Sequence, residues 1–346
     1  MRRIKVFLGG FVNYTNAQNL NCKFIAENLN KNKFEVYALR AHFGDYEKFN
    51  YKTFFCFRPF RMTCHLGFLW GIVKSDVLYL PKHIDTPRWV LVFANFLKKP
   101  IFTTIEGNVT DVNHGHNLIS LFSSKDIMRK HFSYFNAIFA ITERLISNAS
   151  DILKVQPAPL NLGVKIRSTL DYNKEKLTNI VFVGGLTKKK RVDEFLKLAT
   201  FFPMLDFQLV GDGPEFERLL EEATDNVCFL GKLKNSEVYK VLKNADIMFL
   251  PSMSEGFPKV ILEAAAAGVP SIVYNTYGAS DWMDNNLNGF IIKDFEEVKD
   301  VIFKLIKNPN ILKEMSRNAL SLASKYDWNL IIKDWEKVIE NLFYGK

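Results

Sequence analysis

The sequence predicts an α/β protein with two doubly wound, Rossmann-like domains facing a central cleft. Apolar segments of strand length alternate with segments of helical periodicity, and this alternation stops at a polar stretch and then restarts. The length of 346 residues suits two domains of ordinary size. Because parallel sheets bind ligands at the carboxyl ends of their strands, the cleft between the domains is the expected site.

The domain boundaries follow from where the alternation stops. The first domain is predicted over residues 1–165 and the second over 179–324. Between them, residues 166–178 are polar and charged with little apolar periodicity, which predicts a linker. Residues 325–346 contain a last predicted helix, whose apolar side chains recur at helical spacing.

Each element of the first domain is predicted from the spacing of its apolar residues. The predicted strands are 4–8, 34–39, 77–80, 100–105 and 136–141, and the predicted helices are 17–29 and 88–97. Gly9 and Gly10 are predicted to form an amide-rich loop after the first strand. His114 and His116 lie on a predicted loop, where two histidines are either proton carriers or incidental.

The rest of the chain repeats this pattern. Strands are predicted over 179–183, 207–210, 227–230, 246–250 and 271–274, and helices over 192–200, 258–267 and 328–343. A further helix is predicted to open at Ser236 and Glu237, which form a partial capping signal.

The composition excludes several classes of protein. The apolar share of 48% and the charged share of 24% are ordinary for a soluble globular protein. The four cysteines form no Cys-x2-Cys pair and lie near no histidine cluster of metal-ligand spacing, which predicts reduced, unligated thiols in a cytosolic protein. No apolar run approaches the ~18 residues of a membrane span. The short N-terminal run, interrupted by Lys5, favours a buried strand over a signal peptide.

Basic charge is concentrated in the first half of the chain. Residues 1–165 contain 22 Lys and Arg against 11 Asp and Glu, and the remainder contains 24 against 26. An anionic partner, such as a membrane surface or a lipid-linked phosphate, is one interpretation, and solubilising charge is the other. The Phe- and Arg-rich stretch from Tyr51 to Trp70 is either a membrane-facing or acceptor-binding patch or a core helix with a few solvated cations.

The most informative stretch follows the predicted strand 246–250. Gly256 allows a sharp turn, and Pro258 suits the first position of a helix. Gly268 and Pro270 end that helix. Amides at the start of a helix can hold an anion such as a diphosphate. The amides in question belong to Gly256, Phe257, Lys259 and Val260.

Two carboxylates, Glu255 and Glu263, flank this predicted anion site. A carboxylate beside phosphates is unfavourable unless it accepts hydrogen bonds from hydroxyl groups. Both glutamates therefore favour a polyol ligand, such as ribose or a sugar ring. The alternative is an ordinary strand–loop–helix segment with both glutamates on its surface.

This stretch resembles the donor-site signature of the retaining GT-B glycosyltransferases of the group 1, GT4-like family. The signature is Glu-x7-Glu within Glu-Gly-Phe-Pro, Leu-Glu-Ala and Gly-x-Pro, and residues 255–270 match each part. The resemblance implies a GT-B fold, in which the last helix crosses back to the first domain, and a nucleotide-sugar donor. We predict that Glu263 holds the ribose and that Glu255 contacts the sugar hydroxyls.

The basic turn that opens the second domain resembles the family's Gly-Arg-Leu-x3-Lys-Gly turn, whose two cations clamp the donor diphosphate. Lys190 matches the lysine, whereas Gly185 stands in the place of the arginine and Arg191 in that of the glycine. Lys188, Lys189 and Arg191 are candidates to replace the missing cation, although a lysine supplies a point charge and not a bidentate fork. A lysine-rich surface turn is the alternative.

Further positions are assigned by the same resemblance. Gly211 and Gly213 lie in a Val-Gly-Asp-Gly-Pro turn that the family shares. Lys232 and Leu233 follow the strand whose end meets the nucleotide base in this family. Gly10 lies in the predicted loop that corresponds to the family's loop facing the donor sugar or the acceptor.

Glu106 departs from the family pattern. It stands after the predicted strand 100–105, where relatives often have a histidine that touches the donor sugar. The role of that histidine is not carried over. Glu106 is either a replacement acceptor for sugar hydroxyls or a sign of a different site.

Together these features predict a retaining glycosyltransferase that moves a hexose-type sugar from a nucleoside-diphosphate donor, with UDP-sugars favoured. The expected acceptor is a glycan or lipid-linked molecule in bacterial surface polysaccharide assembly. Lys190, Glu255 and Glu106 are the predicted catalytic residues. The alternatives are a non-catalytic nucleotide-sugar-binding protein and a dinucleotide-dependent oxidoreductase, although the chain has no complete Gly-x-Gly-x-x-Gly.

The same interpretation sets the expected partners. No cofactor and no metal ion are expected, because no Asp-x-Asp motif occurs in a suitable turn. No nucleic acid partner is expected. We predict a cytoplasmic protein, in peripheral contact with the inner face of the cell membrane if the basic half meets anionic lipid.

Overall fold

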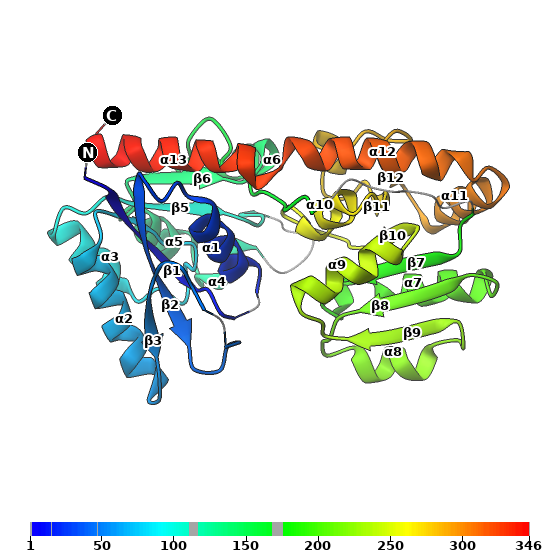
Figure 1. Cartoon of the computed structure of the whole chain (residues 1–346), viewed down its shortest axis with the longest axis horizontal. Coiled ribbons are helices and arrows are strands. Elements are labelled where there is room, and N and C mark those ends of the chain that lie inside the picture. Colours follow the sequence, from blue (N-terminus) through cyan, green and yellow to red (C-terminus); the bar gives the residue numbers. More distant parts are fainter. Residues whose placement is uncertain (1, 15, 47, 111–116, 168–175, 346) are drawn as a thin grey trace. The chain divides into compact units, whose positions relative to one another are not determined.

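The computed structural model describes all of the chain except residues 1, 15, 47, 111–116, 168–175 and 346. The chain forms two compact units (Figure 1). Unit 1 contains Met1–Gly163 and Trp328–Lys346, and unit 2 contains Val164–Asp327. Most of the predicted linker, residues 166–178, lies outside the described residues.

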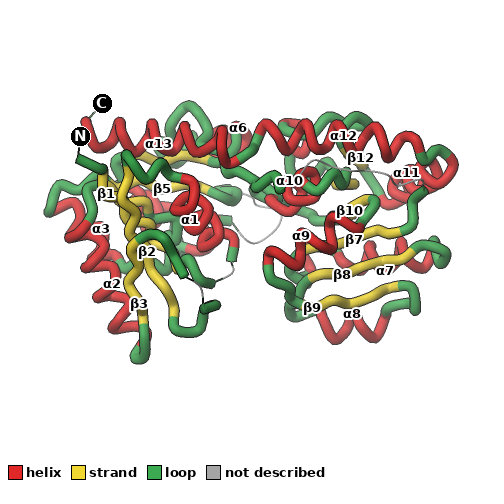
Figure 2. The backbone as a smooth tube through the Cα atoms, in the orientation of Figure 1, coloured by secondary structure: helices red, strands yellow, loops and turns green. Residues whose placement is uncertain are grey.

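Unit 1 is built on a parallel sheet of six strands in the order β3-β2-β1-β4-β5-β6. The strands are β1 (Ile4–Phe11), β2 (Phe34–Ala41), β3 (Lys52–Cys56), β4 (Val77–Tyr79), β5 (Ile101–Ile105) and β6 (Ala137–Ala140). The helices are α1 (Ala17–Asn28), α2 (Phe60–Lys74), α3 (Arg88–Phe96), α4 (Leu118–Leu121), α5 (Lys125–Phe132), α6 (Glu143–Ala149) and α13 (Trp328–Tyr344). The strands are nearly continuous apolar runs because helices cover both sides of the sheet (Figure 2).

Helix α13 completes the core of unit 1, although unit 2 separates it from the rest of that unit in the sequence. The indole of Trp335 is fully buried, and its centroid lies 5.0 Å from that of Tyr79. Its Nε1 donates to the carbonyl oxygen of Asn161 at 2.9 Å. Trp328 packs so closely on Gly163 that a Cβ there would lie 2.6 Å from the indole. The last helix is therefore part of the fold of unit 1.

Unit 2 repeats the same plan with the strand order β12-β11-β10-β7-β8-β9, again all parallel. The strands are β7 (Asn179–Val183), β8 (Asp206–Val210), β9 (Val227–Gly231), β10 (Ile247–Leu250), β11 (Ser271–Tyr274) and β12 (Gly289–Ile292). The helices are α7 (Val192–Phe201), α8 (Phe216–Glu222), α9 (Asn235–Asn244), α10 (Lys259–Ala266), α11 (Phe295–Lys307) and α12 (Asn310–Lys325), with short 3₁₀ helices at Lys188–Lys190 and Ala279–Asp281. The predicted α/β class with two doubly wound sheets is confirmed.

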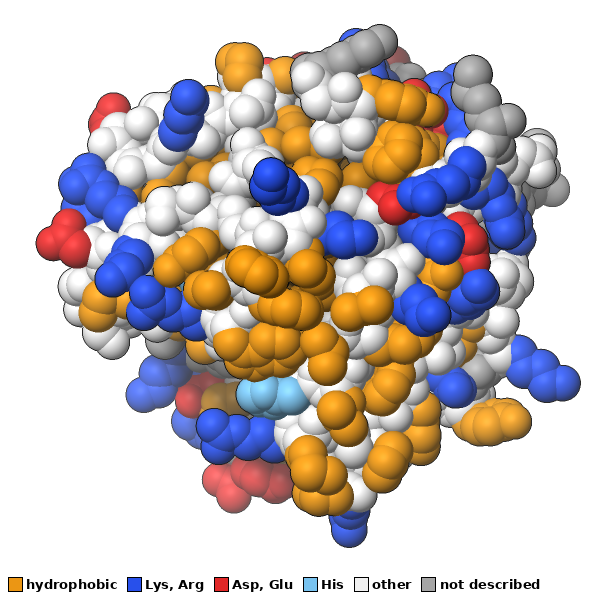
Figure 3. Space-filling view, turned by 90° about the vertical axis from the view of Figure 1, so that its left-hand side faces the viewer, with side chains coloured by type: hydrophobic (Ala, Val, Ile, Leu, Met, Phe, Trp, Pro, Cys, Tyr) orange, Lys and Arg blue, Asp and Glu red, His pale blue; other side chains and the backbone are white. Residues whose placement is uncertain are grey.

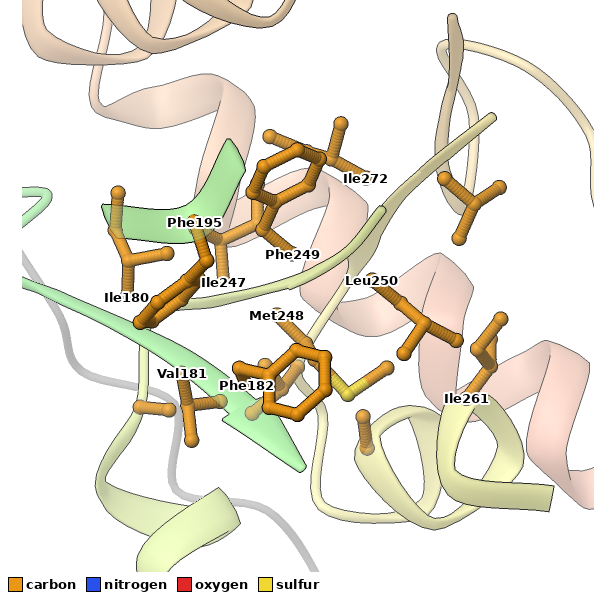
Figure 4. Close-up of a cluster of buried hydrophobic side chains, with 14 of the residues drawn as sticks. Ile180, Val181, Phe182, Phe195, Ile247, Met248, Phe249, Leu250, Ile261 and Ile272 are labelled. Carbon is orange, nitrogen blue, oxygen red and sulfur yellow. The ribbon is translucent and has the colours of Figure 1, made fainter. Parts of the chain in front are cut away.

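The core of unit 2 fixes its two central strands. Side chains of β7 and β10 interdigitate with Phe195 of α7, Ile261 of α10 and Ile272 of β11 (Figure 4). The side chains of residues 180–182 of β7, all four side chains of β10 and these three partners are at most 1% exposed. In this strand order the chain leaves the sheet in opposite directions after β7 and β10, so the topological switch point, where such folds bind ligands, lies between their carboxyl ends.

Several local predictions are wrong, each for a physical reason. Gly9 and Gly10 lie within β1 and not in a loop. Glycine is needed at position 10 because α1 packs closely on the strand, where a Cβ would lie 2.7 Å from Sγ of Cys22. Pro258 is the N-cap of α10 and not its first helical residue, since its ψ of 92° is extended. Helix α9 begins before Ser236, and the side chain of Glu237 accepts from the amide of Lys234 at 2.9 Å.

Candidate active site

Two loops that carry sequence-predicted residues leave adjacent strands of unit 2. One loop follows β7 and leads through the lysine-rich 3₁₀ turn, and the other follows β10 and leads into α10. The amide of Met253 in the second loop donates to the carbonyl oxygen of Lys189 in the first at 3.0 Å. This backbone bond holds the two loops together at the carboxyl edge of the sheet.

Lys190 and Glu255 form an ion pair across these loops. The Nζ of Lys190 donates to Oε1 of Glu255, and the two side chains are only 20% and 12% exposed. The predicted diphosphate-binding cation and the predicted sugar-binding carboxylate are therefore neighbours. A pair that is partly shielded from water interacts more strongly than a surface pair, so each side chain fixes the position of the other.

The anion site predicted from the sequence lies at the start of α10, which follows Glu255 in the chain. The N-cap residue Pro258 supplies no side-chain hydrogen bond to the first turn, and the amides of a first turn have no acceptor within their own helix. The loop before it is held by Phe257, whose ring centroid lies 5.4 Å from that of Trp282 and 5.8 Å from that of Tyr326. Gly256 and Val260 complete the predicted row of amides, and both are half-buried.

Glu263 lies one turn further along α10 and is half-buried. Burial raises the pKa of its carboxyl group, and the nearby charge of Lys259 opposes that change. Its Oε1 accepts a hydrogen bond from Nδ2 of Asn235 at 3.4 Å. The guanidinium of Arg167 donates to Oδ1 of Asn235 at 3.4 Å and lies 4.9 Å from the ring centroid of Tyr239. Glu263 thus ends a chain of polar contacts.

Asn235 and Arg167 were not among the predicted site residues. Asn235 begins α9 directly after the loop that holds the predicted residues Lys232 and Leu233. Its position at the carboxyl end of a parallel strand was the available signal. No local pattern singles out Arg167, because its partners lie far from it in the sequence.

Arg191 is directed away from the ion pair of Lys190. Its guanidinium bonds Glu194 and lies 5.2 Å from the ring centroid of Tyr274, whose hydroxyl also donates to Glu194. Burial raises the pKa of Tyr274 to about 12. The backbone of Arg191 is left-handed, with a φ of 48°, a conformation that glycine adopts with least strain. This left-handed conformation explains why the family pattern has a glycine at the position of Arg191.

The glycines of the site differ in their surroundings. Gly211 has a φ of 149°, and a Cβ there would lie 1.8 Å from the carbonyl oxygen of Gly184. A Cβ at Gly213 would lie 2.4 Å from the carbonyl oxygen of Leu186. By contrast, Gly185 faces open space, with its closest neighbour at 3.9 Å. The position that holds an arginine in the family pattern therefore has room for a side chain.

Tyr277 is a further residue beside this site. Its hydroxyl is buried and has no hydrogen-bond partner among the described residues. Burial raises its pKa well above the ordinary value, and the charge of Glu255 raises it further. Tyr277 was not among the predicted site residues.

Unit 1 presents a separate group of polar residues at the ends of β4 and β5. The carboxylate of Glu106 accepts from Nδ2 of Asn21 at 3.0 Å and from Oγ1 of Thr104 at 3.4 Å. Lys82 is 9% exposed, and its Nζ lies 2.7 Å from the carboxylate of Asp85. Gly10 lies in β1 and packs against α1.

His83 follows Lys82 and is buried. Its Nε2 lies 3.2 Å from the carbonyl oxygen of Thr104. Burial lowers the pKa of His83 to about 3, and the charge of His131 acts in the same direction. Lys82 and His83 were not among the predicted site residues, although they lie shortly after the carboxyl end of β4. The predicted loop histidines His114 and His116 lie outside the described residues.

Within the described ranges, no group of three or more His, Cys, Asp or Glu side chains is arranged to hold a metal ion. In the same part of the chain, no helix has both the length and the apolar character that crossing a membrane requires. All four cysteines are free.

Part of the chain is similar in sequence to known glycosyltransferases. Residues 168–321 match the model of a family described as glycosyl transferases group 1. An uncharacterized glycosyltransferase of Haemophilus influenzae is 31% identical over 178 residues, which are 47% of this chain and 50% of that protein. The alpha-galactosylglucosyldiacylglycerol synthase of Streptococcus pneumoniae is 26% identical over 53% of this chain and 50% of its own length.

A third relative is the N,N'-diacetylbacillosaminyl-diphospho-undecaprenol alpha-1,3-N-acetylgalactosaminyltransferase of Campylobacter jejuni, 29% identical over 49% of this chain and 47% of its own length. The chain thus spans about half the length of these curated relatives.

Two solved structures share the fold over nearly the whole chain. One is Anabaena HepE in complex with UDP-glucose, with a TM-score of 0.77, 16% identity, and coverage of 98% of this chain and 100% of that one. The other is a sucrose-phosphate synthase of Thermosynechococcus elongatus, with a TM-score of 0.80, 14% identity and complete coverage of both chains.

Proposed function

We propose that the chain is a group 1 glycosyltransferase, because residues 168–321 match the model of that family, and that it transfers a hexose-type sugar from a nucleoside-diphosphate donor. The transfer retains the anomeric configuration and takes UDP-sugars in preference to other donors. The acceptor is a glycan or a lipid-linked molecule in bacterial surface polysaccharide assembly.

The observation that carries this proposal is the ion pair of Lys190 and Glu255 beside the start of α10. A cation and a row of helix amides suit a diphosphate, whereas a carboxylate next to them suits sugar hydroxyls. Glu263, one turn along the same helix, suits the ribose. The residues proposed to hold the diphosphate, the sugar and the ribose thus lie at a single edge of unit 2.

The proposed mechanism follows from the charges that develop during transfer. The bond between the anomeric carbon and the diphosphate oxygen breaks, and its electron pair stays on the diphosphate. Lys190 and the amides at the start of α10 stabilise that anion as it forms. The acceptor hydroxyl attacks the anomeric carbon on the same face, and its proton passes to the leaving phosphate oxygen. No side chain is proposed as a nucleophile.

Two further parts of the proposal rest on relatives and on sequence. The HepE structure holds UDP-glucose, which supports a UDP-sugar donor. The name of the Streptococcus enzyme contains a diacylglycerol and that of the Campylobacter enzyme a diphospho-undecaprenol, which supports a lipid-linked acceptor. Glu106 is proposed to accept hydroxyl hydrogen bonds in place of the family's histidine.

The transfer is proposed to need no metal ion, because Lys190 and the helix amides supply the positive charge. Activity that is unchanged after treatment with EDTA is the expected result. Activity that is lost with EDTA and restored by a divalent cation would contradict this part of the proposal.

The decisive experiment measures sugar transfer with the full chain. Calorimetry with UDP, GDP and ADP identifies the preferred nucleotide, and labelled sugars on that nucleotide are then tested with lipid-linked and soluble glycan acceptors. Retention is read from the anomeric coupling constant of the product. Binding of a nucleotide sugar without turnover of any acceptor or water would instead favour a non-catalytic binding protein, as the replacements at Gly185 and Glu106 suggest.

A further inference from the structure

Helix α2 is apolar on two opposite faces. Its inner face packs on the sheet of unit 1, where a Cβ at Gly71 would lie 2.4 Å from the ring of Phe7. The residues buried on this face are Thr63, Gly67, Phe68, Gly71 and Ile72. A helix on the surface of a globular protein ordinarily turns a polar face outward, so the outer face of α2 is unusual.

The outer face of α2 carries a continuous apolar stripe. Met62, Leu66, Leu69 and Val73 follow one another at the spacing of helical turns, and they are 58%, 48%, 38% and 56% exposed. Single exposed apolar residues are common, but a contiguous row of them marks an interaction surface.

Helix α3 extends this stripe. Nε1 of Trp89 on α3 donates to Nδ1 of His65 on α2 at 2.9 Å, which ties the helices together. Val92 and Phe96 are 46% and 78% exposed. Between the two helices lies an open apolar hollow of about 430 Å³. Its lining residues are Leu69, Trp89, Val92, Phe93 and Phe96. We call the exposed apolar side chains of both helices the α2–α3 face.

The charged side chains on helices α2 and α3 themselves are all basic. Residues 48–75 and 86–105, which include both helices, contain eight Lys and Arg and no Asp or Glu. Arg61, Lys74 and Arg88 are exposed and stand next to apolar residues of the face. Figure 3 shows hydrophobic side chains gathered on this side of the molecule, with Lys and Arg around them.

From this arrangement we propose that the α2–α3 face docks on an anionic lipid bilayer. The apolar stripe enters the boundary between headgroups and acyl chains, while the basic side chains meet lipid phosphates. Charge complementarity decides the occupant, because a second copy of this chain would bring the same cations against these ones. A neutral apolar partner would leave the cations without a counter-charge.

The structure thus alters the sequence-based interpretation of Tyr51–Trp70. That stretch forms β3 and the first part of α2. Phe68 is buried, and Phe60 is half-buried against Phe11. Within this stretch only the outer positions of α2, such as Met62, Leu66 and Leu69, belong to the α2–α3 face, which continues beyond the stretch to Val73 and onto α3.

The first test is cosedimentation of the full chain with vesicles, without any sugar nucleotide. Vesicles of equal parts phosphatidylglycerol and phosphatidylcholine should bind the protein, and vesicles of phosphatidylcholine alone should bind at least about tenfold less. Binding should fall as salt rises, because the screening length shortens from about 10 Å at 0.1 M to about 3 Å at 1 M. Equal binding to both vesicles, or none to either, would overturn the proposal.

The second test separates the α2–α3 face from other exposed apolar residues. Leu66→Gln with Phe96→Gln should weaken vesicle binding at least about tenfold, because the loss of two inserted side chains removes much apolar area from the contact. Met204→Gln is the matched control, since Met204 is 72% exposed in unit 2. Equal effects of both variants would overturn the proposal, provided that circular dichroism shows both to be folded.

The third test examines the cations. Arg61→Gln and Lys74→Gln should each weaken binding about fivefold, while Lys313→Gln, an exposed lysine of unit 2, should not. If the face instead joined two copies of the chain, sedimentation without vesicles would show a dimer that Leu66→Gln and Phe96→Gln disrupt, and that result would overturn the proposal.

The fourth test measures, in the vesicle-bound protein, how deeply the α2–α3 face enters the bilayer. Trp89 lines the hollow, so brominated acyl chains should quench part of the tryptophan fluorescence of the wild-type protein and less of that of Trp89→Phe. Equal quenching would overturn the proposed depth of the face. Because none of these measurements uses a donor or an acceptor, lipid binding and sugar transfer can succeed or fail independently.

Discussion

Lys190 and Glu255 lie 65 residues apart in the sequence, yet the ammonium of one is bonded to the carboxylate of the other. Each comes from the loop after a central strand of unit 2. In the proposed reaction the arriving diphosphate competes with Glu255 for Lys190, which frees the carboxylate for sugar hydroxyls. The pair thus keeps two opposite charges in place before the donor binds.

Lys190→Ala should reduce turnover by at least about 10², because one preorganised donor to the leaving group is lost. Steady-state assays with the preferred nucleotide sugar measure this effect. Lys188→Ala is the control, since Lys188 is exposed, and should have a much smaller effect. Near-normal turnover of Lys190→Ala together with inactive Arg191→Ala would move the assignment to Arg191.

Gly185→Arg should restore part of the activity of Lys190→Ala. Gly185 faces open space and can accept a side chain without a clash. The family pattern places an arginine there, and a guanidinium can bind a phosphate through two hydrogen bonds. The double variant is compared with Lys190→Ala in the same assay, and equal rates would show that the new arginine does not reach the diphosphate.

Glu263→Ala should weaken binding of the preferred nucleoside diphosphate by roughly 1.5–3 kcal/mol, the contribution of a charge-assisted hydrogen bond. Calorimetry gives the dissociation constant, and Glu221→Ala, an exposed glutamate on α8, is the matched control. An unchanged dissociation constant in a folded Glu263→Ala protein would defeat the assignment to the ribose.

Glu255→Gln should lower turnover and leave nucleoside-diphosphate affinity nearly unchanged, because its predicted partners are sugar hydroxyls. The amide keeps the size of the side chain and removes its charge, so the position of Lys190 is disturbed less than by alanine. Equal losses of turnover and of nucleotide affinity would place Glu255 on the nucleotide instead.

His83 should make unit 1 less stable in acid. The pKa of His83 is about 3 in the folded protein and about 6.5 in the unfolded chain. Between these pH values the imidazole is therefore protonated in the unfolded chain and neutral in the folded protein. Its stabilising effect is complete above pH 6.5 and falls by up to ~1.4 kcal/mol per pH unit between about pH 6.5 and 3.

Urea unfolding at pH 7 and pH 5 tests this expectation. Tryptophan fluorescence reports mainly on unit 1, which contains all tryptophans except Trp282. His83→Gln keeps a donor near the carbonyl of Thr104 but does not titrate, and should lose about 2 kcal/mol less than the wild type between these pH values. Identical losses would show that His83 does not cause the pH dependence.

Gly211→Ala should destabilise unit 2 by more than about 2 kcal/mol, since the new methyl group meets the carbonyl oxygen of Gly184 at a backbone φ of 149°. Gly185→Ala, in open space, should change stability by less than about 1 kcal/mol. Thermal melts followed by circular dichroism compare the two, and similar melting temperatures would contradict the close approach at Gly211.

The fold was predictable wherever apolar residues follow one simple period. Strand β7 was predicted with its exact bounds, because a run of four apolar residues, 180–183, stands between polar residues on one side and two glycines on the other. Helix α2 was only one of two interpretations of the stretch from Tyr51 to Trp70, because apolar residues on two faces hide the helical period. Gly9 and Gly10 were assigned to a loop because the need for a close approach of α1 to β1 cannot be seen in the sequence.

The site was predictable where its residues stand in one continuous motif. Residues 255–263 supply the loop, the helix start and both glutamates from a single stretch. The contact between Asn235 and Glu263 joins two helices, and the sequence does not state which helices are neighbours. Likewise, the left-handed backbone at Arg191, which turns its charge toward Glu194, depends on the folded turn.

The burial of Trp335 has a consequence for how the protein is made. Its indole fills a space between strands that the ribosome produces near the beginning of synthesis, beside Tyr79 and Phe102. The intervening Val164–Asp327 is contiguous and can complete its own core earlier. During translation, the apolar surface of unit 1 that Trp335 covers therefore stays exposed until unit 2 and then α13 have been synthesised. Unit 1 begins to form first but completes its core last, and its exposed apolar surface is what a chaperone would bind.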